Sequence, residues 1–125
     1  MNIHTITKQK ILSEPFTPDA LKLAKALYNT YIKDDKNLYM EVRVSAIAKL
    51  LRVSADNDGI NYIIKLLEEL NEPILVKDFK FYNKLYPMRF LKFCTYKFDG
   101  DMLEVELNPE YLLVESEYMI DKFLS

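Results

Sequence analysis

Few side chains in this sequence have the types and spacing that catalysis or metal binding requires. The single histidine, His4, lies close to the N-terminus, and Gly59 and Gly100 stand alone, so the sequence has no glycine-rich phosphate loop. Glu104 and Glu106 alternate on one face of a predicted strand, where an acid–base pair could form. The solvated outer face of a sheet is the simpler interpretation. We therefore expect no enzyme activity, no cofactor, no metal site and no small-molecule substrate.

Cys94 is the only cysteine in the 125 residues, which excludes an internal disulfide and a cysteine-based metal cluster. No base is near it in sequence, and its apolar surroundings predict a buried side chain. The longest apolar runs are too short to cross a bilayer, and the first ten residues lack the apolar core of a signal peptide. We expect a soluble, cytoplasmic protein with no membrane partner.

Another group of polar residues has the types that bind nucleic acid. The stretch from Ser45 to Leu70 predicts two helices separated by a polar break, the layout of a helix-turn-helix. In its second helix, Asn57 and Asn61 offer the paired donor and acceptor that an adenine edge requires. Glu68 and Glu69 lie toward the C-terminal end of that helix, which can stay outside a groove. The expected DNA contacts of this unit are Lys49, Arg52, Ser54, Asn57, Asn61, Tyr62 and Lys65.

Charge is distributed unevenly along the chain, although the net charge is only −2. Residues 1–75 are balanced, residues 76–97 contain six basic side chains against Asp78, and residues 98–125 contain eight acids against Lys122. A basic β-ribbon can follow a phosphate backbone, as a wing does. An amphipathic sheet with solubilising lysines is the alternative. The contacts expected from this ribbon are Lys77, Lys80, Lys84 and Arg89.

The helices predicted around these residues have clear boundaries. Thr17 is the expected N-cap of a helix that runs to the polar break at 34–37, with Pro18 at its first position. Ser45 is expected to cap a short helix in which Leu50 faces inward. The following helix, with Ile60 and Ile64 on its buried stripe, ends near residues 71–73 because Pro73 disfavours helix before it. The first fifteen residues are expected to be extended.

The remaining residues predict strands at 39–45, 74–82, 88–98 and 102–108, with a loop at 83–87. Asp99 and Gly100 are expected to form a two-residue hairpin turn, which places Tyr96 opposite Leu103. Leu91 and Phe93 lie on the face of their predicted strand opposite to Cys94 and Tyr96, so both faces of that strand are partly apolar. Such a strand is either covered by helices or exposed at an interface. The second option predicts a homodimer with Leu91 and Phe93 in its interface.

The expected order is helix, strand, helix, helix, three strands, helix. This order predicts an α+β fold of the winged helix-turn-helix type, a single domain over residues 1–125 with a three-helix core and a small antiparallel sheet or wing. The predicted partner is double-stranded DNA. A winged-helix transcriptional regulator and a protein-interaction module without DNA binding remain alternatives, because one fold supports many functions.

From about Leu21 to Phe123 the chain resembles the N-terminal winged-helix domain of plasmid replication initiators, the Rep proteins that bind repeated origin sequences (iterons). VSAIAKLLRVS is similar to the helix that precedes the turn in that family, and NYIIKLLEEL to its recognition-type helix. VELNPEYLL resembles the passage from the last strand into a helix, and EYMIDKFLS a short closing helix. The resemblance implies DNA replication initiation or copy control, with dimerisation and DNA contacts as the activities of the domain.

Overall fold

Helix α1 (Pro18–Lys33) begins where the sequence predicts it, in a computed structural model that describes residues 6–8 and 16–118. Thr17 is extended, and its hydroxyl accepts a hydrogen bond from the backbone N–H of Ala20, which satisfies one of the free donors of the first turn. The buried stripe of α1 consists of Ala20, Leu23, Ala24 and Leu27. The helical spacing predicts an apolar stripe that includes Ala24, Leu27 and Ile32. The first two are buried, and Ile32 is exposed.

Helices α2 (Val44–Leu51) and α3 (Asn57–Leu70) follow the short strand β2 (Tyr39–Arg43). The prediction that Ser45 caps α2 was wrong, because the helix already begins at Val44 and Arg43 occupies the N-cap position without a side-chain bond. Leu50 is partly exposed rather than inward-facing. Helix α3 is capped by Asp56, whose carboxylate accepts from the N–H of Gly59. The helical pattern therefore predicted both helices but not each boundary residue.

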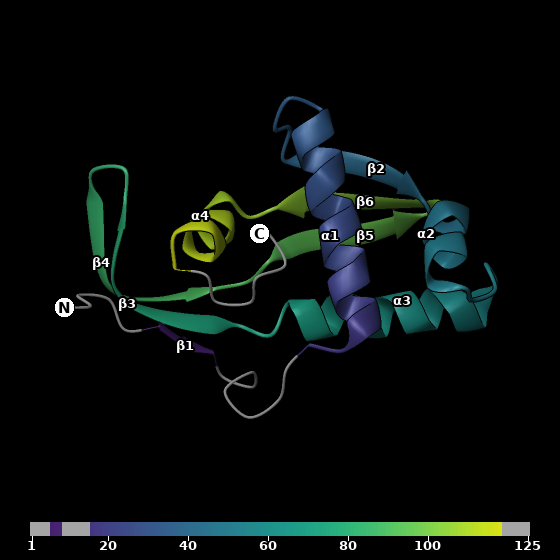
Figure 1. Ribbon diagram of the computed structural model, residues 1–125, viewed down its shortest axis with the longest axis horizontal. Coiled ribbons are helices and arrows are strands. Elements are labelled where there is room, and N and C mark those ends of the chain that lie inside the picture. The colour runs from purple at the N-terminus through teal and green to yellow at the C-terminus, as the bar shows by residue number, and fades with distance from the viewer. Residues whose placement is uncertain (1–5, 9–15, 119–125) are drawn as a thin grey trace.

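Two small antiparallel sheets complete an α+β fold, the class that the sequence predicts (Figure 1). In one sheet, β6 (Met102–Leu107) lies between β2 and β5 (Cys94–Asp99). In the other, β3 (Ile74–Phe81) lies between β1 (Ile6–Lys8) and β4 (Lys84–Leu91). Helix α4 (Pro109–Tyr118) follows β6. The strand β1 was not predicted, and residues 119–125, which include most of the expected closing helix, lie outside the described residues.

The segment 83–98 differs most from the prediction. The structure turns at Tyr82 and Asn83 and places two strands, β4 and β5, where one strand at 88–98 was expected. Pro87 was assigned to a loop because proline cannot donate a ladder hydrogen bond. It is tolerated here because β4 is an edge strand. The ladder is interrupted between Lys77↔Met88 and Phe79↔Tyr86, where Pro87 faces Asp78 with its φ of 55°.

The β5–β6 hairpin has its turn one residue later than predicted. Asp99 pairs with Met102, so Gly100 and Asp101 form the turn, and Gly100 has a φ of 60°. A positive φ at the first central position alone is typical of a type II′ turn, which favours glycine there. The register is therefore shifted by two residues, and Tyr96 pairs with Val105 rather than with Leu103. A shift of two leaves every side chain on its predicted face.

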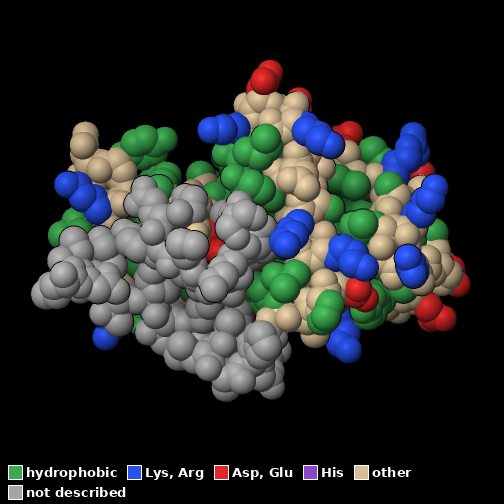
Figure 2. Space-filling view, viewed as in Figure 1, with side chains coloured by type: hydrophobic (Ala, Val, Ile, Leu, Met, Phe, Trp, Pro, Cys, Tyr) green, Lys and Arg blue, Asp and Glu red, His purple; other side chains and the backbone are tan. Residues whose placement is uncertain are grey.

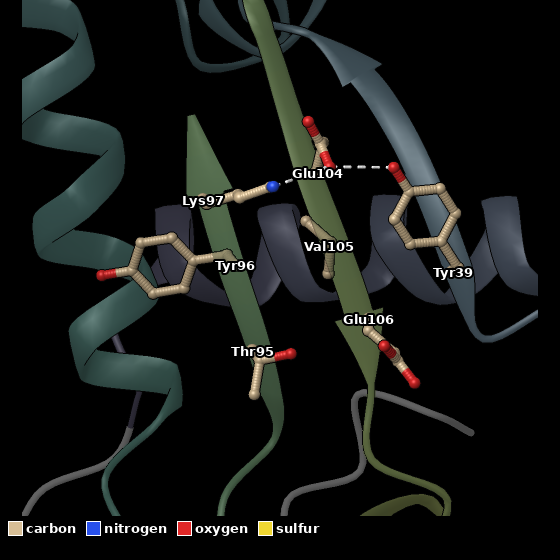
Figure 3. Close-up of a pocket in the computed structure, with 7 residues that line it drawn as sticks. All are labelled: Tyr39, Thr95, Tyr96, Lys97, Glu104, Val105 and Glu106. Carbon is tan, nitrogen blue, oxygen red and sulfur yellow. Dashed lines mark hydrogen bonds and ion pairs between the residues drawn. The ribbon is translucent and has the colours of Figure 1, made fainter. Parts of the chain in front are cut away.

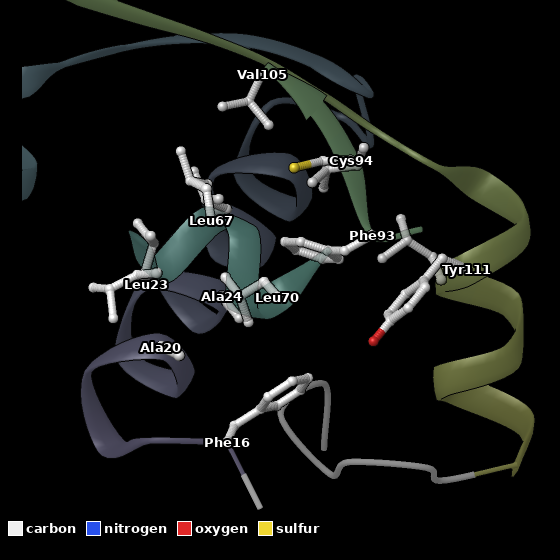
Figure 4. Packing of buried hydrophobic residues seen from close by; sticks show 14 of the residues in the cluster. Phe16, Ala20, Leu23, Ala24, Leu67, Leu70, Phe93, Cys94, Val105 and Tyr111 are labelled. Carbon is white, nitrogen blue, oxygen red and sulfur yellow. The ribbon is translucent and has the colours of Figure 1, made fainter. Parts of the chain in front are cut away.

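The core lies between the helices and the inner face of the β2–β6–β5 sheet. Leu23 and Ala24 of α1 face Leu67 and Leu70 of α3, and Val105 covers them from the sheet (Figure 4). The burial of these apolar side chains supplies the main favourable term in folding.

Candidate nucleic-acid interface

The turn between α2 and α3 is built from local hydrogen bonds. Arg52 ends α2 in the left-handed conformation, with a φ of 60°, and the N–H of Val53 donates to the carbonyl of Ala48 at 2.9 Å. At the start of α3, hydrogen bonds from Ser54 and from the backbone N–H of Gly59 lower the pKa of the Asp56 carboxyl. Gly59 is required because a Cβ there would lie 1.6 Å from the carbonyl oxygen of Ser54. The two helices therefore meet at a fixed and close turn.

Six of the seven residues predicted on this unit are exposed at its surface, and Tyr62 is half-buried. On α3, Asn57, Asn61 and Lys65 are spaced by four residues, and therefore share one face. Lys49 and Arg52 are exposed at the end of α2. We call these five residues the α2–α3 face. It presents amide donors and acceptors from the first two turns of α3, beside three cationic side chains.

Two of the seven predicted contacts are used within the protein. The Ser54 hydroxyl donates to the Asp56 carboxylate at 2.7 Å, so it is not a spare donor for a phosphate. The Tyr62 ring packs on the core, and its hydroxyl donates to Asp19 of α1. That bond is the main cause of the raised pKa of Tyr62. The sequence pattern places Tyr62 outside the buried stripe, but α1 covers it in the tertiary structure.

The carboxylates that make α3 acidic have structural partners. Glu69 accepts from the backbone N–H of Thr17 at 2.7 Å and from its hydroxyl at 3.0 Å. This carboxylate lies at the start of α1, where the helix dipole favours a negative charge. Glu68 accepts from the hydroxyl of Tyr96 on β5. Both acids therefore join α3 to neighbouring elements at the end remote from Asn57.

The β3–β4 hairpin carries the other predicted contacts. Lys77, Lys80 and Lys84 are exposed, and no ion pair to them exists within the described part of the chain. Arg89, also predicted to contact DNA, already has partners within the protein. Its Nε and Nη2 atoms donate to the two carboxylate oxygens of Glu110 at 2.8 and 3.0 Å, and its guanidinium lies 4.3 Å from the Tyr86 ring centroid. Arg89 therefore joins the hairpin to α4, and these two donors are used within the protein.

The two basic groups lie far apart. Figure 1 shows α2 and the start of α3 at one end of the long axis and the tip of the β3–β4 hairpin at the other. Helix α3 alone extends over about 21 Å at 1.5 Å per residue, and β3 continues in the same general direction. The hairpin is therefore not a wing beside the first turns of α3. Each basic group needs a separate functional explanation.

The residues predicted for the dimer interface are buried inside the protein. Leu91 is 2% exposed and Phe93 is fully buried, so neither can form an interface between folded copies. Phe93 packs edge-on against Tyr111 of α4, with ring centroids 5.5 Å apart (Figure 4). Of the two options for a strand with two apolar faces, burial beneath a helix is the one observed.

The outer face of the β2–β6–β5 sheet contains an arrangement that the sequence did not predict (Figure 3). The Tyr39 hydroxyl lies 2.9 Å from a carboxylate oxygen of Glu41 and 2.9 Å from one of Glu104, and these bonds raise its pKa. Lys97 lies 3.8 Å from Glu104. Glu106 faces Thr95, as expected for a solvated outer face. Tyr39 reduces the repulsion between Glu41 and Glu104, which are directly opposite across β2 and β6.

No family model matches the sequence, and no curated protein is significantly similar to it. Among residues 6–8 and 16–118, no helix is both long enough and apolar enough to cross a membrane. The same residues contain no group of three potential ligands placed to hold a metal ion. The functional argument therefore depends on geometry.

Proposed function

We propose that this chain is a winged-helix domain of the replication-initiator type that binds double-stranded DNA through the α2–α3 face. The fold proposal is supported by the sheet order β2–β6–β5. In this sheet β2, which follows α1, pairs with β6, the second strand of the β5–β6 hairpin. A helix-turn-helix packed on such a three-stranded sheet is the winged-helix arrangement. The resemblance to replication initiators makes origin repeats the proposed target and favours initiation over transcriptional regulation.

The observation that carries the proposal is the exposure of Asn57 and Asn61 on the first two turns of α3. Helix-turn-helix proteins insert these turns into the major groove, where an asparagine amide can bind adenine with two hydrogen bonds. Lys49, Arg52 and Lys65 surround the amides and neutralise phosphates. Asp58 is the exposed acid of the first turn and disfavours close approach of a phosphate on its side.

The test begins with duplexes that the protein enriches from a random pool at low salt. Their affinity for the protein is then measured by the fluorescence anisotropy of labelled duplexes. Asn61→Ala should alter the sequence preference, with a loss of roughly 1–3 kcal/mol at one base pair. Arg52→Gln should weaken all duplexes and reduce the slope of log K against log salt by about 0.9. Lys97→Gln on the outer sheet face is the matched control and should change neither. If the protein binds no duplex even at low salt, the proposal is refuted.

A second candidate activity is self-association through β4. This strand is an edge of its sheet among the described residues, and Leu85, Met88 and Phe90 are 60%, 57% and 59% exposed. An edge strand with exposed apolar side chains is a common site of strand pairing between chains. Light scattering should give a dimer for the wild type and for Ile32→Glu, and a monomer for Phe90→Glu. A wild-type monomer at high concentration would exclude this activity.

A further inference from the structure

An open cleft of about 380 Å³ lies between the end of α1, the loop after it, the tip of the β3–β4 hairpin and the first turns of α4. In Figure 2, viewed as in Figure 1, the hairpin and the end of α1 stand as two separate projections in the outline of the molecule. Tyr28 and Tyr31 line one side, and Phe81 and Tyr82 line the other. Pro109 and Leu112 of α4 also contribute to its lining. This volume is within the range of about 300–1,000 Å³ that is usual for ligand pockets.

Aromatic rings are the main feature of this cleft. Tyr28 and Tyr31 are three residues apart and share one face of α1, with ring centroids 5.7 Å apart. Phe81 contacts Tyr82 edge-on at 4.6 Å. Tyr82 is 84% exposed, so its ring contributes little to the core and most of its surface is accessible to a ligand. Four rings on two facing walls make a platform on which flat molecules can stack.

The charge around the cleft is positive along the hairpin. Lys36 is the charged side chain that lines the cleft. Lys84 pairs with Phe81 across the hairpin, so both side chains lie on one face of it, whereas Lys80 lies on the opposite face. All three lysines are exposed and lack an ion-pair partner within residues 16–118. The exposed Asp34 and Asp35 precede Lys36, and the Asp34 carboxylate accepts from the Asn37 side chain at 3.3 Å. Lys36 and Lys84 therefore provide the attraction for an anionic ligand.

We propose that this cleft binds single-stranded nucleic acid by stacking one or two unpaired bases on Tyr82 and Tyr31. Proteins that bind single strands combine aromatic platforms with a cationic path for the backbone, and the hairpin provides both. A duplex does not fit, because its base faces are already stacked. A small aromatic anion would use the rings and Lys36 but leave Lys84 without a role. The cleft is remote from the α2–α3 face and does not depend on the duplex-binding proposal.

The experiment measures anisotropy of labelled twelve-residue oligo(dT), oligo(rU) and a duplex of the same length with the complete chain. Tyr82→Ala should weaken oligo(dT) binding roughly 5- to 100-fold, the effect of losing one base–aromatic stack. Tyr82→Phe should retain most of the affinity. Tyr39→Ala, which removes a tyrosine from the outer face of the other sheet, is the matched control and should have no effect. If Tyr82→Ala weakens the binding of oligo(dT) and oligo(rU) equally, the site accepts both deoxyribose and ribose strands. If the two losses differ, the site prefers one of the two sugars.

Salt dependence tests the role of the lysines. Lys84→Gln should reduce the slope of log K for oligo(dT) against log salt by about 0.7, and Lys80→Gln, on the opposite face of the hairpin, should leave it unchanged. Arg52→Gln, on the α2–α3 face, should leave oligo(dT) binding unchanged, which separates this site from the duplex site. Oligo(dT) binding that is as strong in Tyr82→Ala as in wild type would overturn the proposal. Competition by thymidine monophosphate at the same concentration as oligo(dT) would also overturn it, because it would define a small-molecule site.

Discussion

Replacing Arg89 with methionine should destabilise the fold without a specific effect on nucleic-acid binding. Its two hydrogen bonds to Glu110 are charge-assisted, and the Arg89 and Glu110 side chains are 37% and 15% exposed. Buried bonds of this kind contribute about 1.5–3 kcal/mol, and fully exposed ion pairs about 0.2–1. We expect about 1–2 kcal/mol for this partly exposed pair and about 0.5 more for the contact with the Tyr86 ring.

Urea denaturation followed by far-UV circular dichroism measures this loss, since the chain contains no tryptophan. The expected decrease of about 2 kcal/mol corresponds to a fall of roughly 6–10 °C in Tm for a domain of this size. Lys80→Met is the matched control. It replaces an exposed cationic side chain with methionine, as Arg89→Met does, and should change stability by less than about 0.5 kcal/mol.

A double-mutant cycle with Glu110→Gln then isolates the pair, with an expected coupling of about 1–2 kcal/mol. Affinity for duplex DNA, corrected for the folded fraction, should be equal in Arg89→Met and wild type. If Arg89→Met is as stable as Lys80→Met and loses DNA affinity instead, the structural role assigned to Arg89 is wrong.

Three further perturbations test the packing around α1, α3 and β5. Gly59→Ala should lower the free energy of unfolding by more than about 2 kcal/mol in urea denaturation, because its new methyl group collides with the Ser54 carbonyl; a more stable variant would contradict this geometry. Glu69→Ala should cost about 1 kcal/mol, because the start of α1 loses two hydrogen bonds from Thr17, and an unchanged midpoint would show that water replaces the carboxylate. Burial raises the pKa of the Cys94 thiol to about 11, above its value near 8.5 in an unfolded chain. The neutral thiol therefore stabilises the fold fully below pH 8.5, and up to about 3 kcal/mol of stability is lost as the pH rises toward 11. Cys94→Ala should lack this component of the alkaline pH dependence. Identical profiles of stability against pH for wild type and Cys94→Ala would refute this role of the thiol.

Local signals in the sequence determined the helices and the faces of the strands. The Thr17 cap and Pro18 act within one turn, so three or four residues suffice to locate the start of α1. Alternation with a period of two placed Glu104 and Glu106 on the outer face of β6, and the register error of two residues did not alter that face. The α+β class and the exposure of Asn57 and Asn61 follow from the same periodicities.

Contacts between distant residues were decided only by the tertiary structure. Arg89 and Glu110 are 21 positions apart, and Tyr62 and Asp19 are 43 apart, so no local pattern links either pair. Each contact engages a predicted DNA-binding residue within the protein. The direction of the β3–β4 hairpin depends likewise on long-range packing, which carries its lysines away from the start of α3. The sequence determined which side chains are polar, and the tertiary structure determined which of them are available to a partner, because availability depends on what the rest of the chain packs against.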